Sequence, residues 1–270
     1  MMEKKYEKLQ QIINKMGRVL VAFSGGVDST FLLRAALDSL GRQKVLAVTA
    51  DSPIRFSGGA KKARQLAEEL KVEHRVIETR ELEDEDFLRN DRLRCYYCKR
   101  ELYGRLTEIA AEEGIPVVLD ATNAEESSGD YRPGLRALQE YGIESPLKTT
   151  GWSKMEIRNY SRKLDLPTWD QPSDSCLATR VTYNLELNSI RLEKLRRIEE
   201  YLQSFNFKQL RARLHDEHTI RIEVLPEEME KIMDNREEIC QRLKKEDINY
   251  ITLDLEGYRS GSMNDILEEI

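Results

Sequence analysis

The first two thirds of the chain alternate short apolar runs with amphipathic segments of helical spacing. Segments such as Ser29–Gly41 and Gly59–Leu70 place apolar residues at helical intervals, and the first ends on a glycine, as helices often do. Strands that alternate with helices form βαβ units, so the pattern predicts an α/β fold with a mostly parallel sheet. The expected strands are Val19–Phe23, Val45–Ala50, Val72–Ile77 and Val117–Asp120.

The pattern changes after a stretch rich in proline and turn formers, Asp165–Tyr183, which we expect to be a loop that joins two domains. The elements beyond it read helix, strand, strand, helix, strand, an order typical of a small α+β domain. We therefore predict one domain over residues 1–180 and a second over residues 181–270. The later elements are expected at Leu185–Phe205, Leu210–Leu214, Thr219–Val224, Glu227–Lys245 and Tyr250–Leu255.

One segment of the first part fits neither period. Residues 80–94 (RELEDEDFLRNDRLR) are highly charged, so we expect a mobile or exposed excursion before a pair of cysteines. Beyond it, Tyr96–Glu113 has helical spacing.

A glycine-rich turn, SGGVDST, lies between the first strand and the helix that follows it. Gly25 and Gly26 allow the backbone to approach an anion, and the free N–H groups at the helix start are donors for phosphate. Ser24, Ser29 and Thr30 add hydroxyl groups. Asp28 would repel phosphates unless a cation lay between them, so we assign it to Mg²⁺. The turn lacks the lysine of P-loop NTPases, and it predicts a nucleotide site rather than an ordinary βα turn.

Cysteines are few and clustered. Cys95 and Cys98 form a CxxC at a helix start, a pattern that suits a metal, a cluster or a redox pair, and Cys176 lies in the later loop. Three cysteines from two segments are enough for three irons of a 4Fe–4S cluster. A zinc site lacks a recognisable fourth ligand, and inert thiols are the remaining alternative. Cys240 reads as a buried helix residue.

The charge balance is acidic throughout. The net charge is −6; residues 1–179 carry 28 basic and 29 acidic side chains, and residues 180–270 carry 15 and 20. We therefore expect no nucleic-acid partner. With neither a signal-like nor a membrane-length apolar run, we expect no membrane association and a cytoplasmic location.

The SGGVDST turn resembles the signature of the PP-loop ATP pyrophosphatases. The resemblance implies a Rossmann-like sheet, ATP with Mg²⁺, adenylylation of a substrate, and adenine near the end of the second strand at Ala50 and Asp51. Further motifs closely resemble the LarE family of ATP-dependent sulfur transferases, which matures a nickel-pincer cofactor: SDSCLATR, DYRPGLRAL and YITLDLEGYRSGSMND.

This second resemblance covers essentially the whole chain. It implies adenylylation of a pyridinium dicarboxylate mononucleotide and its conversion to a thiocarboxylate. It also implies the branch in which Cys95, Cys98 and Cys176 hold a 4Fe–4S cluster, with Cys176 catalytic but not consumed as sulfur donor. We therefore expect a small mononucleotide substrate, a sulfide donor and a homo-oligomer.

Arginines of the second part form the remaining candidate site. Arg211 and Arg213 alternate along an expected strand, so both should point to one face, and guanidinium groups suit phosphate or carboxylate. A solvated strand face with salt bridges is the alternative. The family resemblance favours phosphate binding by Arg211, Arg213 and Arg259. It places Glu199 and Glu223 near the same site, and Asp130, Arg132 and Arg180 in shared motifs.

Three rival functions share part of this pattern. A tRNA thiolase of the PP-loop type also uses three cysteines, but the acidic balance disfavours it. An amide-forming synthetase such as NAD synthetase would leave the cysteines without a purpose. A nucleotide-binding sensor of iron or redox state would bind ATP without turnover.

Overall fold

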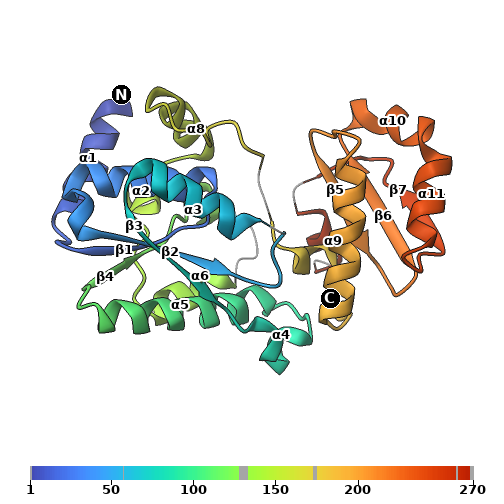
Figure 1. The fold of residues 1–270 in the computed structure, drawn as a ribbon, viewed down its shortest axis with the longest axis horizontal. Coiled ribbons are helices and arrows are strands. Elements are labelled where there is room, and N and C mark those ends of the chain that lie inside the picture. The colour runs from blue at the N-terminus through green and yellow to red at the C-terminus, as the bar shows by residue number, and fades with distance from the viewer. Residues whose placement is uncertain (1, 57, 128–132, 173–174, 260, 268–270) are drawn as a thin grey trace. The chain divides into compact units, whose positions relative to one another are not determined.

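The computed structural model describes residues 2–56, 58–127, 133–172, 175–259 and 261–267. Its internal contacts divide the chain into two compact units (Figure 1). The first unit comprises residues 1–52, 57–81 and 95–173, and the second comprises residues 53–56, 82–94 and 174–270. The division of roles between residues 1–180 and 181–270 stays a prediction.

The first unit is built on a parallel sheet of four strands in the order β3-β2-β1-β4. The predicted α/β class is therefore confirmed. Leu20 on β1 pairs with Leu46 on β2 and with Val118 on β4, which fixes the register of the three central strands. The strand bounds are β1 Val19–Ala22, β2 Val45–Asp51, β3 Glu73–Glu78 and β4 Val117–Leu119.

Helices cover both faces of this sheet, with α2 and α3 on one face and α5 on the other (Figure 1). The change of face follows from right-handed crossovers, because the chain runs outward from β1 to β3 and then returns to the far side of β1 at β4. The helices of this unit are α1 Met2–Asn14, α2 Val27–Leu40, α3 Gly59–Leu70, α5 Arg94–Glu112, α6 Gly134–Glu140, α7 Pro146–Thr149 and α8 Lys154–Lys163.

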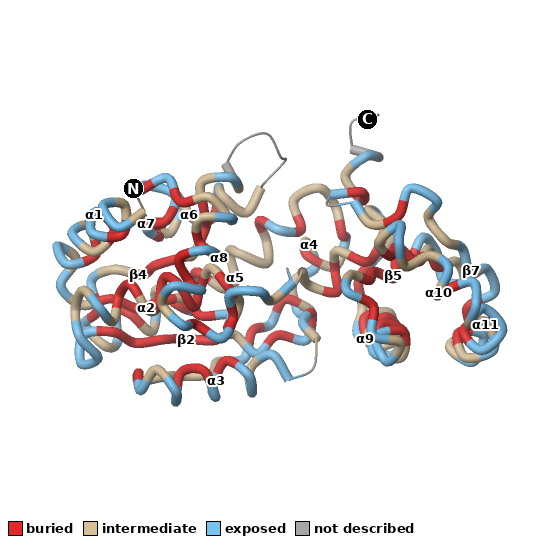
Figure 2. Tube along the Cα trace, turned by 90° about the horizontal axis from the view of Figure 1, so that it is seen from above, coloured by how far each residue is buried: buried red, intermediate tan, exposed pale blue. Residues whose placement is uncertain are grey.

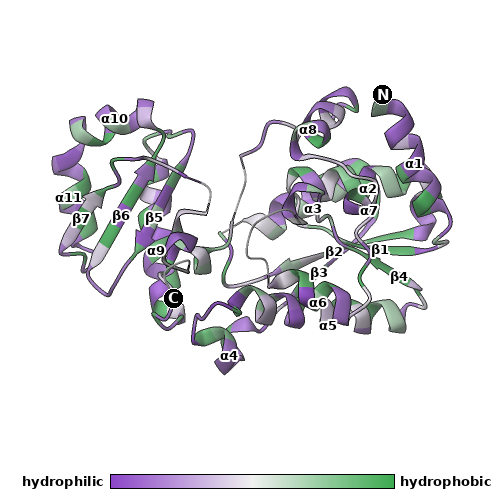
Figure 3. Cartoon of the chain, turned by 180° about the vertical axis from the view of Figure 1, so that it is seen from behind, coloured by the Kyte–Doolittle hydropathy of each residue, from purple (hydrophilic) through white to green (hydrophobic). Residues whose placement is uncertain are grey.

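Burial explains why these segments were recognisable. The first five residues of β2 are buried (Figure 2), and β1 is uniformly hydrophobic (Figure 3), as expected for strands covered on both faces. Next to the sheet, Phe31 of α2 packs against the ring of Trp152, with centroids 4.8 Å apart, and Tyr6 stacks on Tyr160 at 4.8 Å. This aromatic cluster packs α1, α2 and α8 together.

The second unit contains a three-stranded mixed sheet in the order β5-β6-β7, with β5 antiparallel and β7 parallel to β6. Its helix α9 packs on β5. The strands are β5 Leu210–Leu214, β6 Thr219–Val224 and β7 Tyr250–Leu253, and the helices are α4 Glu85–Leu88, α9 Ser189–Gln203, α10 Met229–Asp234 and α11 Arg236–Lys244.

Short 3₁₀ turns connect the elements of both units. They are η1 Arg42–Lys44, η2 Glu81–Glu83, η3 Glu125–Ser127, η4 Leu177–Arg180, η5 Pro226–Glu228 and η6 Ser262–Leu267. Among the described residues, no helix is both long and apolar enough to cross a membrane.

The expected exposed excursion at residues 80–94 was wrong in part, because only Arg80, Glu83, Glu85 and Arg89 are exposed. This segment contains α4, and the side chains of Phe87, Asn90 and Arg94 are buried. Hydrogen bonds from Asn90 to the carbonyl oxygens of Thr182 and Leu185 explain how this polar side chain can be buried.

The single helix expected at Glu227–Lys245 is divided into α10 and α11. Asn235 interrupts it with φ −103° and ψ 13°, and its side chain donates to the carbonyl of Lys231. Asparagine favours such helix ends because its side chain competes for backbone hydrogen bonds.

Candidate functional site

The SGGVDST turn runs from the end of β1 into α2. Gly25 has φ +73°, and a Cβ atom there would lie 3.3 Å from Ala63 of α3, so both the backbone conformation and the space require glycine. Gly26 caps α2 without a side-chain hydrogen bond. The first N–H groups of α2 therefore have no side-chain cap, as an anion site requires.

Hydroxyl groups of the turn bond to one another. The Oγ atoms of Ser24 and Ser29 are 2.9 Å apart, and the backbone N–H of Ser24 donates to Ser29 Oγ over 3.2 Å. Thr30 is fully buried, and its Oγ1 has no hydrogen-bond partner among the described residues. These hydrogen bonds between the serines hold the loop in shape without a ligand. The Oγ1 atom of Thr30 is a polar atom that a ligand could bind.

Asp28 has two differently placed oxygens. Its Oδ2 forms an ion pair with Lys154, whereas its Oδ1 is buried and has no hydrogen-bond partner in the described chain. An orphaned, buried carboxylate oxygen beside an anion site fits a ligand of Mg²⁺. The structure therefore supplies the kind of oxygen that the sequence-based assignment of Mg²⁺ to Asp28 needs.

Lys154 is a candidate functional residue that sequence reasoning missed. It opens α8, where a capping box between Ser153 and Glu156 fixes the helix start, and Glu156 in turn pairs with Lys5. The capping box was readable in the sequence as S-x-x-E, but its proximity to Asp28, 126 residues away, was not.

A second cluster of polar side chains that the sequence did not predict lies where β4 ends. Ala50 and Asp51 are at the carboxyl end of β2, while Asp120 follows β4 on the other side of β1. Asp120 accepts from Lys99 over 3.1 Å and from Tyr103 over 2.9 Å. Burial opposes ionisation of Asp120, but the Lys99 charge and the hydrogen bonds from Thr122, Lys99 and Tyr103 together outweigh it and lower the pKa of the carboxyl. Ligands of open α/β sheets bind at such a switch in strand order.

The CxxC pair lies at the start of α5, close to where the sequence predicts it. Cys95 is exposed and Cys98 is partly buried, and the Cys98 Sγ lies 3.9 Å from Oε1 of the buried Glu81. Cys176 belongs to the second unit, where it is partly buried at the start of η4.

None of the four cysteines forms a disulfide. Within the described ranges, no three His, Cys, Asp or Glu side chains are grouped so as to hold a metal ion.

The side chain of Arg180 supports the backbone of the Cys176 loop. Its side chain is 1% exposed and donates to the carbonyl oxygens of Ser175, over 3.0 Å, and of Cys176, over 3.3 Å. Glu199 on α9 accepts from Arg180 Nε over 2.9 Å and from the backbone N–H of Ala212 over 2.7 Å. The two residues, both predicted site members, form a buried ion pair that fixes the loop.

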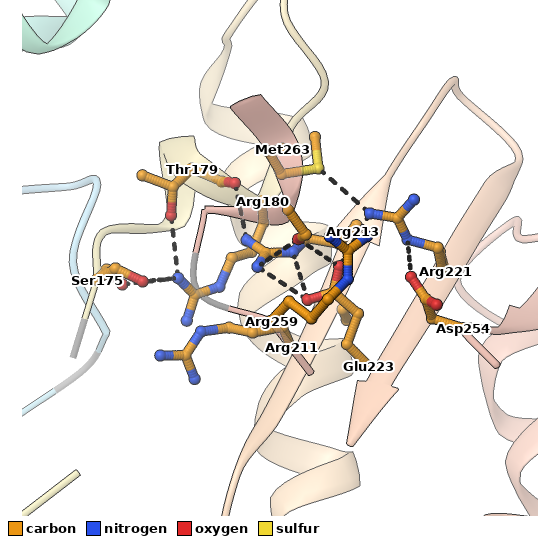
Figure 4. Close-up of polar contacts among 12 residues, drawn as sticks. Ser175, Thr179, Arg180, Arg211, Arg213, Arg221, Glu223, Asp254, Arg259 and Met263 are labelled. Atoms are coloured by element: carbon orange, nitrogen blue, oxygen red, sulfur yellow. Dashed lines mark hydrogen bonds and ion pairs between the residues drawn. The ribbon is translucent and has the colours of Figure 1, made fainter. Parts of the chain in front are cut away.

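Arg213 and Glu223 form a second buried pair in the same unit (Figure 4). Arg213 Nη2 lies 2.9 Å from Glu223 Oε2, and Glu223 also accepts from Ser262 and Arg221. Burial raises the cost of ionising Glu223, but the hydrogen bonds, led by that from Arg213, lower its pKa below the ordinary value.

Arg211 is 8% exposed, and its guanidinium lies 5.3 Å from the ring centroid of Tyr258. Burial, followed by the positive charge of Arg180, lowers its pKa. A nearby anion would relieve both effects. The strand face that carries Arg211 and Arg213 is thus buried and not solvated.

Arg259 differs from the other arginines of the set. Its side chain is exposed and pairs with Glu256 over 2.7 Å and with Asp265 over 3.0 Å. The remaining predicted residues, Asp130 and Arg132, lie outside the described residues.

Comparison with known proteins adds a family to this geometry. Residues 1–128 match the model of a PP-loop domain family. An uncharacterized protein of Synechocystis is 37% identical over 99% of both chains. The pyridinium-3,5-bisthiocarboxylic acid mononucleotide synthase of Lactiplantibacillus plantarum is 35% identical over 94% of this chain and 92% of its own. A glutamine-dependent NAD(+) synthetase of Aquifex aeolicus is 34% identical over only 76 residues.

Proposed function

Because this chain belongs to the LarE family of PP-loop sulfur transferases, we propose that it acts on a pyridinium-3,5-dicarboxylate mononucleotide. It is an ATP-dependent transferase, and the product would be the corresponding thiocarboxylate. The proposal rests above all on one observation, the uncapped start of α2 beside the orphaned oxygen of Asp28. A site of that kind suits a nucleoside triphosphate with a divalent cation.

The first step is activation of the substrate. A carboxylate oxygen attacks the α-phosphate of ATP, and the N–H groups after Gly26 stabilise the phosphates of the leaving pyrophosphate. Asp28 would hold Mg²⁺, which when bound neutralises part of the phosphate charge. Lys154, already paired with Asp28, places a second positive charge at the loop. Ala50 is proposed to contact the adenine.

The second step transfers sulfur. We propose that Cys95, Cys98 and Cys176 hold a 4Fe–4S cluster, because the set offers three thiol ligands and none is engaged in a disulfide. Such a cluster, when bound, would supply the sulfide that is transferred. Arg180 and Glu199 keep the backbone around Cys176 in place while AMP leaves the acyl carbon.

Substrate phosphate would bind in the second unit. Arg211 and Arg213 are the proposed phosphate ligands, with Arg259 contributing from its exposed loop. Glu223 orients Arg213 through two charge-assisted hydrogen bonds, which leaves less side-chain entropy to be lost on binding. We also propose that the protein forms a homo-oligomer and receives sulfide from an external donor.

The first test is iron and acid-labile sulfide in anaerobically purified protein, together with its visible spectrum. We expect about four irons per chain. Absence of iron after reconstitution, with dehydroalanine formed at position 176, would replace the cluster by a Cys176 that gives up its own sulfur.

The second test separates the proposal from its rivals. Pyrophosphate release should depend on the pyridinium substrate. Release with unmodified tRNA instead would favour a tRNA thiolase, which the acidic balance disfavours. ATP binding without turnover would favour a sensor.

A further inference from the structure

A chain of hydrogen bonds crosses three neighbouring strands in the sheet of the first unit. The hydroxyl of Thr49 on β2 donates to the carbonyl oxygen of Phe23 over 2.6 Å. The Nε2 atom of His74 on β3 lies 2.8 Å from the same hydroxyl oxygen. Thr49 is 3% exposed and Phe23 is 2% exposed. The chain therefore reaches from β3, through β2, to the residue that follows β1.

The direction of these hydrogen bonds follows from the atoms involved. A carbonyl oxygen can only accept, so the single hydrogen of the Thr49 hydroxyl points to Phe23. The hydroxyl oxygen must then accept from His74, which requires a hydrogen on Nε2. Burial, followed by the positive charge of Arg64, lowers the pKa of His74, while the charge of Glu68 opposes the shift. The imidazole is therefore neutral at about pH 7, with its hydrogen on Nε2.

The carbonyl of Phe23 belongs to the peptide unit that opens the glycine-rich turn. The N–H of the same unit is that of Ser24, and it donates to Ser29 Oγ over 3.2 Å. Because a peptide unit is planar, hydrogen bonds to its oxygen and from its N–H together fix its orientation. This orientation sets the path of the chain into Gly25, where φ is +73° and Ala63 leaves no room for a side chain.

The middle of the hydrogen-bonded chain lies next to the other proposed nucleotide contact. Thr49 directly precedes Ala50, the proposed contact of the adenine. One side chain thus connects the strand end assigned to the adenine with the turn assigned to the phosphates. ATP extends across both places, and a ligand binds more tightly when the groups that receive it are already held in position.

We infer that Thr49 and His74 are positioning residues for ATP, which hold the phosphate turn in register with the adenine end of β2. Thr49 fixes the turn directly, and His74 directs the Thr49 hydrogen toward Phe23 by donating to the hydroxyl oxygen. Neither side chain needs to touch the nucleotide for this effect. The inference rests on the proposed nucleotide site, and its test measures ATP binding, which does not depend on the identity of the carboxylate substrate.

The test measures the dissociation constant of Mg²⁺–ATP by calorimetry in the whole protein. Thr49→Val keeps the branched shape of the side chain but removes the hydroxyl, and it should weaken ATP binding about tenfold. Thr49→Ser keeps the hydroxyl and should bind ATP within about twofold of the parent. His74→Leu should weaken binding about threefold, because the Thr49 hydroxyl loses the donor that directs it. His74→Gln, whose amide can donate from a similar position, should recover most of this loss.

Thr150→Val is the matched control. Thr150 is also buried, at 7% exposed, and its hydroxyl also donates to a backbone carbonyl over 2.6 Å, that of Pro146. This bond lies at the end of α7 and not at the glycine-rich turn. We expect Thr150→Val to lower the melting temperature, as Thr49→Val does, and to leave the dissociation constant of ATP unchanged. In turnover, Thr49→Val should raise the KM for ATP and leave the KM for the pyridinium substrate unchanged.

Unchanged ATP binding in Thr49→Val would overturn the inference. An equal weakening in Thr150→Val would also overturn it, because the effect would then come from a general loss of stability. A parent that binds no ATP would refute the nucleotide site and the inference with it. A parent that binds ATP but releases no pyrophosphate with the pyridinium substrate would refute the proposed function alone, because the positioning role is measured by binding.

Discussion

Replacing Glu199 by leucine should destabilise the protein strongly. Glu199 is the sole carboxylate partner of Arg180 in the described structure, and the two side chains are 7% and 1% exposed. Leucine removes the acceptors of two guanidinium hydrogen bonds and of the Ala212 N–H. It leaves a buried charge without compensation.

Removing one partner of a buried ion pair costs about 3–5 kcal/mol, which sets the expected loss in the free energy of unfolding. Glu199→Gln retains one acceptor oxygen, so its loss should be smaller, about 1–3 kcal/mol. The double variant Arg180→Met/Glu199→Leu should recover most of the loss, because no isolated charge remains.

Urea denaturation followed by far-UV circular dichroism measures these differences. A loss below about 1 kcal/mol for Glu199→Leu would refute the reasoning, since the ion pair would then contribute no more than a surface pair. Failure of the double variant to recover would show that the destabilisation comes from lost hydrogen bonds or packing and not from the buried charge.

Four further predictions concern the residues of the site. Asp28→Asn should abolish pyrophosphate release while the iron content of the protein stays unchanged. Lys154→Met should raise the Mg²⁺ concentration needed for half-maximal pyrophosphate release. Unchanged Mg²⁺ dependence would contradict a role for Lys154. Gly25→Ala should weaken ATP binding at least tenfold in calorimetry, because φ +73° and the 3.3 Å approach to Ala63 both oppose a side chain. The folded-state pKa of Glu223 lies below its unfolded value of about 4.3, so its stabilisation is present above that pH and is lost as the pH falls through the folded pKa. Melting temperatures between pH 6 and pH 3 should therefore fall more steeply in the parent than in Glu223→Gln, and parallel curves would contradict the lowered pKa.

The sequence predicted the parallel sheet well because burial on both faces produces continuous apolar runs, as in Val45–Asp51. It also predicted the turn at Ser24–Thr30 and the CxxC at the start of α5, which depend on local backbone chemistry. These features are encoded within about ten neighbouring residues.

Other features depend on partners that are distant along the chain. Residues 80–94 are rich in charge and so were predicted to be exposed, yet Asn90 and Arg94 bond to residues some ninety positions later. The pairing of Lys154 with Asp28 spans 126 residues. No local hydrophobic pattern in the sequence predicts such contacts, because hydrogen-bond partners that are distant along the chain meet only in the folded protein.

The second unit is assembled from three separate stretches, and this affects how the protein is made. Residues 82–94 leave the ribosome well before Thr182 and Leu185, their later partners, are synthesised. At about 5–20 residues per second, the interval between Asn90 and Thr182 is on the order of ten seconds. During that time Phe87, Asn90 and Arg94 lack the later residues that bury them. The nascent chain therefore exposes these side chains, and chaperones are suited to cover them. A polypeptide limited to residues 181–270 would lack this segment entirely and should fold poorly by itself.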